Sequence, residues 1–396
     1  MLDVGAGSHT EFTCEDVTMM QEKRFPVVEM QGSHFEMGQQ YGQQCRGLIR
    51  DLSAQFDGIF VPDATRHRAA RGAMVDAVPF VRAAAPALIE EVEGIASGAD
   101  LSFEDAFRMN CSAEMGQWRG CQEQRSAVSI AEADECTTLA ACTNTATLVA
   151  WNMDWHRLLQ PYMVLLKGRP DDGPAFHAFA LAGSVGRPGL SESIAISANQ
   201  LPYRSGPTPP GADGPAWAGP GVPYCFLSRM LLEQESTAAA LELLERTRRM
   251  GCLNYTLGDA TGDICCVETT PTAQAVLPRE ESFVTHANSY HSPRFSGLPQ
   301  AERERRDPRA HAAQTLLLDH RGRVERDVIT MAQRYHFPGQ CTGVCHHTET
   351  TMTLLSFVAE VGQGRMWAAY GSPCEHAFLP YSLEPPRRRS RSGVHG

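Results

Sequence analysis

The hydrophobic pattern of the N-terminal third of the chain is mainly helical. Between Val81 and Ala96, apolar residues recur every three or four positions, which predicts one helix with a buried face. A second helix is expected to begin at Ser102, a good N-cap residue, because acidic side chains follow it in "SFEDAF". These patterns predict a largely helical segment ahead of residue 136.

An earlier stretch, "RFPVVEMQGSHFEMGQQYGQQCRGLI", has the pattern of a short strand, a glycine-containing turn and a helix. Gly38 and Gly42 lie on one face of that helix. Glycine lowers helix propensity, but it also allows another backbone to approach closely. We therefore expect this helix face to pack tightly against a neighbouring element.

From Cys136 onward the pattern changes to short β-prone runs. Thr, Val, Leu and Ile recur in runs such as "CTTLAACTN", "TLVAWNMDW", "YMVLLKG" and "SIAISAN", which are separated by Asn, Gly and Pro. This pattern predicts many successive strands, mostly in antiparallel hairpins. The Pro- and Gly-rich stretch 205–223 interrupts the strands and is expected to be a surface loop near the site.

Two pairs of helices are expected among these strands. The first pair is "FLSRMLLEQ" and "STAAALELLERTRRM", with Ser236 as a candidate N-cap, and the second pair spans 307–320 and 325–335. The order of helices, strands, helices and closing strands is typical of an α+β fold with two sheets and helical outer layers. Because no repeat of fixed period is evident, the pattern argues against a solenoid or propeller.

The composition of the chain bears on which partners it can bind and on the cellular compartment in which we expect it. The 396 residues contain 35 Lys and Arg against 46 Asp and Glu, a net charge of −11, and the basic residues are scattered apart from 387–391. This balance argues against a nucleic-acid partner, and we expect 385–396 to be a flexible tail. No leader is evident, and no run approaches the ~18 apolar residues of a membrane helix. We expect a soluble cytoplasmic protein with no membrane partner.

The cysteines do not form a recognisable framework. Thirteen cysteines without a repeating spacing are expected to be reduced thiols. The motif "CTGVCHH" looks like half of a metal site, but its cysteine spacing differs from that of a common zinc knuckle and no second pair lies nearby. We therefore expect no metal and no cofactor. The weaker alternative is a metal-dependent protein that uses Cys341, Cys345, His346 and His347.

The stretch "ADECTTLAACTNTATLVAWNMDWH" contains a candidate nucleophile. Cys136 precedes two β-branched threonines, which would hold a rigid strand behind it, and Asp154 lies eighteen positions later between two tryptophans. Common hydrolase and nucleotide signatures, such as G-x-S-x-G and G-x-G-x-x-G, are absent. If the peptide bond before Cys136 is cleaved, the new α-amine, which titrates near ~8, can serve as the base for the thiol.

The chain resembles the N-terminal-nucleophile cysteine hydrolases and acyltransferases related to isopenicillin N acyltransferase and the β-alanyl-amine hydrolases. The resemblance extends from about Val27 to Pro373. It is carried, in the order of the family, by "GSHFEMGQQYGQQ", "EEVEGIASGAD", "ECTTLAA", "WNMDWH", "GDICCVE", "THANS" and "GSPCEH". It implies the four-layer αββα sandwich of that fold, with two antiparallel sheets flanked by helices.

The resemblance also implies roles for four residues. Cys136 would be the nucleophile and the first residue of a mature β-subunit, and Asp154 would accept hydrogen bonds that orient its amine or thiol. Asn288 in "THANS" would donate to the negative oxygen of the tetrahedral intermediate. Arg309 in "RRDPRAHAAQTLL" resembles the arginine that opens a helix in some relatives. The candidate pocket residues, for which structural roles are the alternative, are Trp155, His156 and His286.

One departure from the penicillin-related members stands directly before the nucleophile. Those members have glycine there, whereas this chain has Glu135, preceded by Asp134. A bulky acidic residue reduces backbone freedom at the bond to be broken and places negative charge beside the thiol. Two outcomes stay open: the carboxylates slow self-cleavage, or they assist proton transfer.

We therefore expect a precursor that is cut between Glu135 and Cys136. The α-subunit, 1–135, would stay associated with the β-subunit, 136–396, because elements on both sides of the cut share one core. The activity would be transfer of an acyl group from a small N-acyl amine, amide or thioester to Cys136 and then to water or an amine. A homo-oligomer is compatible with the sequence. The alternative is a binding protein of the same fold that is never processed.

Overall fold

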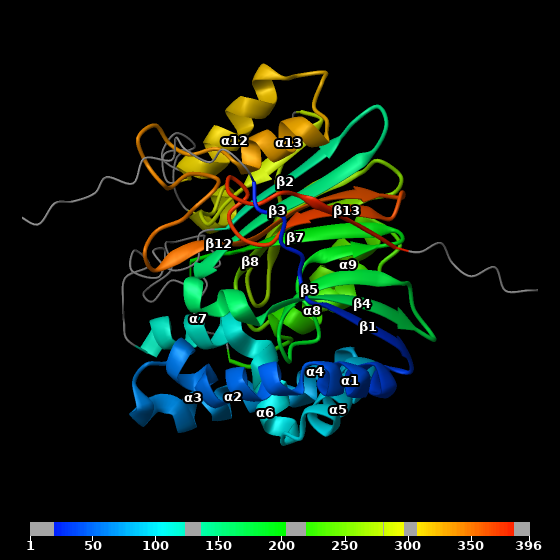
Figure 1. Cartoon of the computed structure of the whole chain (residues 1–396), viewed down its shortest axis with the longest axis vertical. Helices are drawn as coiled ribbons and strands as arrows, with labels where there is room; N and C mark the ends of the chain where they lie inside the picture. Colours follow the sequence, from blue (N-terminus) through cyan, green and yellow to red (C-terminus); the bar gives the residue numbers. More distant parts are fainter. Residues whose placement is uncertain (1–19, 123–135, 203–218, 280, 297–306, 384–396) are drawn as a thin grey trace, which may run out of the picture.

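The computed structural model describes residues 20–122, 136–202, 219–279, 281–296 and 307–383. In this part of the chain, two sheets face each other and helices cover their outer sides (Figure 1). Helices α12 (Pro308–Asp319) and α13 (Arg326–Gln333) pack on one sheet, and helices α8 (Tyr224–Leu232) and α9 (Thr237–Arg246) pack on the other. The predicted αββα sandwich is confirmed.

The smaller sheet has six strands, and each neighbouring pair is antiparallel. Their order is β11 (Phe283–His286), β2 (Thr137–Cys142), β3 (Thr147–His156), β12 (Thr351–Val361), β13 (Arg365–Ala369) and β14 (Leu379–Ser382). The strand that follows Cys136 is therefore an inner strand, with hydrogen-bonded neighbours on both sides.

The larger sheet has eight strands, and one neighbouring pair, β1 with β4, is parallel. Their order is β1 (Val27–Gly32), β4 (Met163–Pro170), β5 (Phe176–Leu181), β6 (Gly189–Ser191), β7 (Ile194–Gln200), β8 (Leu253–Asp259), β9 (Ile264–Thr269) and β10 (Gln274–Val276). Because β1 precedes Cys136 in the chain and β4 follows it, both sides of the expected cut contribute to one sheet.

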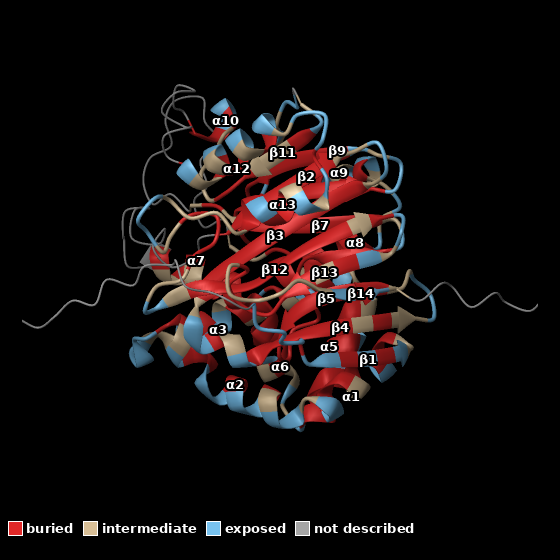
Figure 2. Cartoon of the chain, turned by 45° about the horizontal axis from the view of Figure 1, so that its top comes forward, coloured by how far each residue is buried: buried red, intermediate tan, exposed pale blue. Residues whose placement is uncertain are grey.

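The facing sides of the two sheets form the main core (Figure 2). Phe179 of the larger sheet stacks on Phe357 of the smaller sheet, with 5.4 Å between ring centroids. Trp151 also meets Phe357, edge to face. Stacked aromatic rings of this kind bury large apolar areas. These contacts fix the register of the strands that hold the candidate site.

A group of helices lies beside one end of the sandwich (Figure 1). They are α1 (His34–Gln44), α2 (Arg46–Phe60), α3 (His67–Val75), α4 (Val78–Ala84), α5 (Pro86–Ala99), α6 (Phe103–Arg108) and α7 (Ser112–Gln122). Helices α1 and α5 touch through glycines: a Cβ atom at Gly38 would lie 2.0 Å from the carbonyl oxygen of Glu91. The close approach expected at this helix face is present.

The single helix predicted between Val81 and Ala96 is two helices. Helix α4 ends at Ala84 and helix α5 begins at Pro86, with Ala85 at φ −149° and ψ 69° between them. Proline has no N–H and disfavours a helical conformation in the residue before it, so the chain bends at Ala85. The apolar stripe is nevertheless buried on both helices.

The predicted N-caps at Ser102 and Ser236 are confirmed. The Ser102 side chain accepts a hydrogen bond of 3.1 Å from the backbone N–H of Asp105, and Ser236 accepts one of 3.2 Å from Ala239. Among the described residues, none of the helices combines the length and apolar character needed to cross a membrane.

Candidate functional site

Cys136 directly precedes β2 and is buried, with 7% of its surface exposed. Strand β2 lies between β3 and β11, and Thr138 faces Trp151 on one side and His286 on the other. Asp154 follows on the neighbouring strand β3 and is 1% exposed. The hairpin register therefore brings the predicted nucleophile and the predicted aspartate to the same end of the sheet.

Arg309 contacts the other three residues predicted to act in catalysis. One guanidinium nitrogen lies 3.4 Å from the backbone oxygen of Cys136, to which it donates, and 3.7 Å from a carboxylate oxygen of Asp154. The second terminal nitrogen donates a 2.9 Å hydrogen bond to Oδ1 of Asn288. A planar guanidinium can direct several donors at once, which a lysine cannot do. Arg309 therefore joins residues from β3, the start of β2 and the loop after β11.

The position of Arg309 follows from the N-terminus of α12. Asp307 is the N-cap of this helix, and Pro308 takes the first helical position, where its missing N–H costs nothing. Arg309 comes next, so it lies in the first turn. Its side chain is mostly buried, at 11% exposure.

The two polar ends of the Asn288 amide have different partners. Oδ1 accepts the hydrogen bond from Arg309, and Nδ2 donates one of 2.7 Å to the backbone oxygen of Gln200. Each partner suits only one orientation of the amide, so together they define it. An amide nitrogen carries two hydrogens, which leaves one available to a developing oxyanion.

A polar network holds the loop that carries Asn288. Glu268 on β9 accepts a 3.0 Å hydrogen bond from the backbone N–H of Ser292 and lies 3.0 Å from a ring nitrogen of His286. Asp307 accepts hydrogen bonds from Ala287 N–H at 3.1 Å and from the His291 ring at 2.9 Å. Burial opposes ionisation of Asp307, but its hydrogen bond with His291 and the nearby charges of His291, His286 and Arg309 together outweigh that effect, so the pKa of its carboxyl group is lowered. The same carboxylate therefore positions both the Asn288 loop and the Arg309 helix.

Thr353 supports Asp154 and was not found from the sequence. Its hydroxyl donates a 2.5 Å hydrogen bond to Oδ1 of Asp154 and accepts one of 3.0 Å from the backbone N–H of His346. A register shift between Thr353 and Leu355 interrupts the pairing of β12 with β3 at this point. A lone threonine in a β-prone run carries no sequence signal for such a role.

A small cavity opens beside Cys136. The volume of this cavity is about 30 Å³. Its described lining consists of Ala113, Cys136, Trp151, Met153, Asp154, Trp155, Arg187, Ala198, Gln200, Tyr224 and Leu253. The lining is mainly apolar with a few polar groups beside the thiol, which is the usual character of a small-molecule site.

Arg187 is a cation in this lining, and no motif in the sequence predicts its role. It is 3% exposed, and its guanidinium carbon lies 4.7 Å from the ring centroid of Trp155 and 5.4 Å from that of Tyr224. One nitrogen donates a 2.5 Å hydrogen bond to the hydroxyl of Ser112, whereas Nε has no hydrogen-bond partner in the described part of the chain. A buried arginine with an unused donor is suited to an anionic or carbonyl-bearing ligand.

Glu114 is buried near Arg187. Burial raises the pKa of its carboxyl group to about 7, against smaller lowering effects from the Tyr224 backbone N–H and from the charge of Arg187. The Tyr224 N–H donates to this carboxylate at 2.6 Å. Glu114 therefore changes protonation state near neutral pH and alters the electrostatic field around the cavity.

The predicted pocket residues lie in different places. Trp155 lines the cavity. His156 is half-buried and accepts a hydrogen bond from the backbone N–H of Leu158, and His286 is buried against Glu268. Neither histidine is among the described lining residues. Glu135, most of the loop 205–223 and the tail 385–396 lie outside the described residues.

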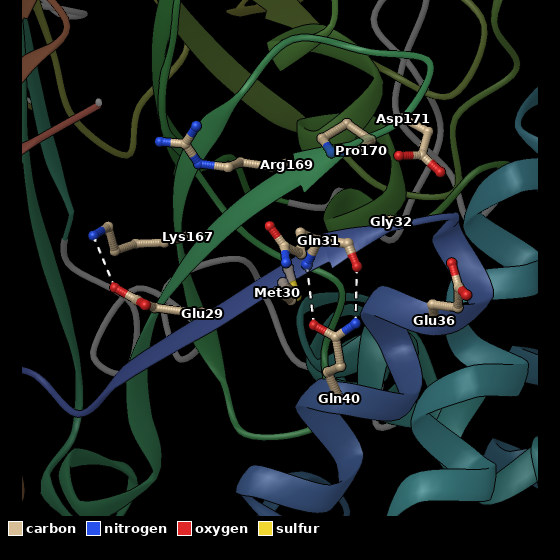
Figure 3. Close-up of a pocket in the computed structure, with 10 residues that line it drawn as sticks. All are labelled: Glu29, Met30, Gln31, Gly32, Glu36, Gln40, Lys167, Arg169, Pro170 and Asp171. Atoms are coloured by element: carbon tan, nitrogen blue, oxygen red, sulfur yellow. Dashed lines mark hydrogen bonds and ion pairs between the residues drawn. The ribbon is translucent and has the colours of Figure 1, made fainter. Parts of the chain in front are cut away.

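A larger hollow lies between β1, β4 and the start of α1 (Figure 3). It measures about 900 Å³ and shares no lining residue with the cavity beside Cys136. Gln40 holds the backbone of Gln31 with two hydrogen bonds, and Lys167 pairs with Glu29 at 3.1 Å. Its described lining contains no thiol, hydroxyl or imidazole side chain, and its one amine, that of Lys167, is held in the ion pair with Glu29.

A separate group of side chains can hold a metal ion. It consists of His336, Cys345, His347 and Cys374. The sequence motif contributes only Cys345 and His347, whereas Cys341 and His346, which the metal-dependent alternative included, are not members. Sequence spacing missed this group because its other two members lie on either side of the motif, near the ends of α13 and β13.

Comparison with known families identifies a match in the C-terminal part of the chain. Residues 217–375 match the family described as acyl-coenzyme A:6-aminopenicillanic acid acyl-transferase. The predicted family resemblance is confirmed over these residues. The matched segment includes Asn288, Arg309 and Thr353, whereas Cys136 and Asp154 precede it.

Solved structures give more distant likenesses. The N-acylethanolamine-hydrolyzing acid amidase ortholog of Caenorhabditis elegans is 14% identical, with 63% of this chain and 100% of that chain covered and a TM-score of 0.43. A variant of the conjugated bile acid hydrolase of Clostridium perfringens is 12% identical, with 63% and 97% covered and a TM-score of 0.39. None of the curated proteins matches the chain.

Proposed function

We propose that the protein is a self-processing cysteine amidohydrolase or acyltransferase that works through an acyl-enzyme on Cys136. Its substrate would be a small N-acyl amine, amide or thioester. The observation that supports this most strongly is the contact of Arg309 with Cys136, Asp154 and Asn288. Arg309 thereby links three residues, Cys136, Asp154 and Asn288, that come from different segments of the chain.

Self-processing would begin at the bond between Glu135 and Cys136. The Cys136 thiolate attacks the carbonyl carbon of Glu135, the C–N bond breaks, and the released nitrogen takes a proton to become the α-amine. Water then hydrolyses the thioester, which leaves a carboxylate on Glu135 and regenerates the thiol. The products are the chains 1–135 and 136–396.

The catalytic cycle would use the new α-amine as the base. It accepts the thiol proton while Sγ attacks the acyl carbonyl of the substrate. The remaining amide hydrogen of Asn288 stabilises the oxygen that becomes negative, and removal of such a donor typically costs ~100-fold or more in turnover. The leaving amine takes the proton, and water or an acceptor amine then releases the acyl group from Cys136.

Asp154 and Arg309 would position the reacting groups. Asp154 is buried on β3, at the end of the sheet where β2 begins, and is held by Thr353, so after processing it can accept hydrogen bonds from the α-ammonium group of Cys136. Arg309 holds the Cys136 backbone oxygen and the Asn288 side chain at the same time. Loss of either residue would displace the nucleophile from its oxyanion donor, and misplacement of about 1 Å is enough to slow such reactions strongly.

Both products of the cut are proposed to remain together. The strand β1 pairs along its whole length with β4, and Glu91 of α5 forms a buried ion pair of 2.8 Å with Arg229 of α8. The sheet and this ion pair join residues from both sides of the cut. Separation would break this ion pair, leave the edge of β4 without its partner strand and expose the apolar surface between the two products to water.

Intact mass of the purified chain tests the proposal. We expect two co-purifying chains whose masses correspond to 1–135 and 136–396, and a single chain for Cys136→Ala. Cys142→Ala, which removes a thiol at the other end of β2, serves as the matched control and should process normally. A wild-type chain that stays whole after prolonged incubation would support the unprocessed binding protein instead.

The acyl-enzyme is tested separately from processing. The processed chain is mixed with a panel of N-acyl amines and acyl thioesters and quenched in acid. We expect a mass increase equal to the acyl group on the peptide that begins with Cys136. Labelling of another cysteine, or of none across the panel, would refute Cys136 as the acyl carrier.

A further inference from the structure

Four side chains with soft or borderline ligand atoms meet on the side of the smaller sheet that α13 covers. His336 follows α13, Cys345 and His347 lie in the loop before β12, and Cys374 follows β13. Each offers one ligand atom, and the four atoms all lie within 4.8 Å of one another. Four such groups rarely converge in a loop region without a shared ligand.

Two of the distances between the ligand atoms match the edges of a tetrahedral zinc site. The sulfur atoms of Cys345 and Cys374 are 3.5 Å apart, and Nε2 of His347 is 3.5 Å from the sulfur of Cys374. With Zn–S near 2.3 Å and Zn–N near 2.0–2.1 Å, the edges of a tetrahedral site measure about 3.4–3.8 Å. The rings of His336 and His347 stand at 89° to each other, so they can point nitrogens at one centre from different directions.

Backbone hydrogen bonds hold the ligands in place independently of any ion. Cys345 N–H donates to the oxygen of Tyr335 at 3.0 Å, and His347 N–H donates to the oxygen of Cys341 at 2.9 Å. The backbone at Gly343 lies so close to that of Tyr335 that a Cβ atom at Gly343 would be 2.6 Å from the Tyr335 carbonyl oxygen. The loop is therefore held against the residue that precedes His336.

We propose that His336, Cys345, His347 and Cys374 bind one Zn²⁺ ion in a closed tetrahedral site. Thiolate and imidazole ligands in this geometry favour zinc over magnesium or calcium. Binding replaces the thiol protons of the two cysteines, which pass to solvent. Because four protein ligands fill the coordination sphere, the ion is structural and leaves no position for substrate.

The site is connected to the nucleophile through the loop that carries it. His346, between two of the ligands, donates its backbone N–H to the hydroxyl of Thr353, and Thr353 donates to Asp154. The His346 side chain is not a member of the cluster, and its Nε2 lies 2.7 Å from the hydroxyl of Thr351. The ion thus stabilises the loop from which Asp154 is oriented.

Metal content of the full chain tests the site without reference to activity. Chain purified with Zn²⁺ present and then desalted should carry about one zinc per chain. Cys374→Ser should lower that content at least tenfold, whereas Cys341→Ser, which removes a thiol of the same loop outside the cluster, should leave it unchanged. Substitution with Co²⁺ should produce thiolate-to-metal charge transfer and the visible bands of a tetrahedral complex.

A second measurement uses the wild-type chain, so it does not depend on whether the variants fold. A chelator added to the wild-type chain should lower its unfolding temperature, and Zn²⁺ but not Mg²⁺ should restore it. The proposal is overturned if the wild-type chain binds no zinc, if Cys341→Ser loses as much zinc as Cys374→Ser, or if intact mass shows a Cys345–Cys374 disulfide in place of the metal.

Discussion

Arg309 donates a 2.9 Å hydrogen bond from its guanidinium group to Oδ1 of Asn288. The two residues belong to different elements, because Asn288 lies in the loop after β11 and Arg309 lies in the first turn of α12. The bond directs the Asn288 amide nitrogen away from Arg309, and the same guanidinium reaches the Cys136 backbone. This arrangement makes the geometry of the guanidinium, and not only its charge, important for the site.

Arg309→Lys is therefore expected to lower turnover although the charge is retained. Lysine cannot reach Asn288, Asp154 and Cys136 together, so we expect a loss of about 10-fold or more. Steady-state kinetics on processed enzyme measures the effect. Arg323→Gln, at an exposed position beyond the same helix, is the control and should keep full activity. Unchanged turnover in Arg309→Lys would show that charge alone suffices.

Thr353→Val tests the orientation of Asp154. Valine keeps the shape of threonine but removes the hydrogen bond to the carboxylate, worth about 1.5–3 kcal/mol for a charged partner. We expect slower processing and slower turnover, by about 10- to 100-fold. The rate of appearance of the two chains by mass measures processing. Thr145→Val, at an exposed turn position, should process at the wild-type rate.

Arg187→Gln tests which acyl groups the cavity accepts. The unused donor of Arg187 leads us to expect better binding of acyl groups that end in a carboxylate. The substitution should raise KM for such a substrate by about 10- to 100-fold, because hydrogen bonds between charged groups contribute about 1.5–3 kcal/mol. A neutral-ended substrate of the same length is the control. Equal effects on both substrates would indicate a packing role for Arg187.

Glu114→Gln tests the pH dependence of stability. The folded chain holds the Glu114 proton up to about pH 7, whereas the ordinary value is 4.5. Between these values the folded state binds more protons than the unfolded state, so stability falls as pH rises through this window and is then level. Glutamine still accepts from Tyr224 but does not ionise.

The variant should therefore gain free energy of unfolding relative to wild type as pH rises, by at most about 3 kcal/mol. Urea unfolding below and above this window measures the gain. Glu104→Gln, at an exposed position, should show no such trend. A pH-independent difference between wild type and Glu114→Gln would mean that the carboxyl group does not titrate in the window.

Gly38→Ala tests the contact between α1 and α5. The added methyl group would meet the Glu91 carbonyl oxygen, so the helices must separate, at a cost of roughly 1–3 kcal/mol. Gly47→Ala on α2 is the matched control because open space surrounds that position. It should be neutral or stabilising by about 0.5–1 kcal/mol. Thermal unfolding of both variants measures the difference, and equal shifts would argue against close packing at Gly38.

Local patterns in the sequence were sufficient for several features of the fold. Apolar spacing located the buried stripe between Val81 and Ala96. The break into two helices at Pro86 was missed, because the sequence pattern around this proline is compatible with one helix and with two. The runs "CTTLAACTN" and "TLVAWNMDW" were predicted as successive strands, and they form the antiparallel pair β2 and β3. A hairpin connects neighbours in sequence, so its register follows from local pattern.

Other features depended on contacts between distant elements. Thr353 and Arg187 have no motif, and they become recognisable only when β12 pairs with β3 and when the loop after β5 closes on the cavity. His336 and Cys374 complete the cluster from positions on either side of "CTGVCHH", so spacing alone suggested the wrong partners, Cys341 and His346.

The sequence by itself determined the element types, the two-sheet order and the candidate nucleophile, because periodicity, caps and short motifs are local properties of the chain. Only the tertiary structure decided which side chains surround Cys136 and which complete the group around Cys374. Those side chains come from segments that meet through sheet register and helix packing, and long-range contacts of this kind leave no fixed spacing in the sequence.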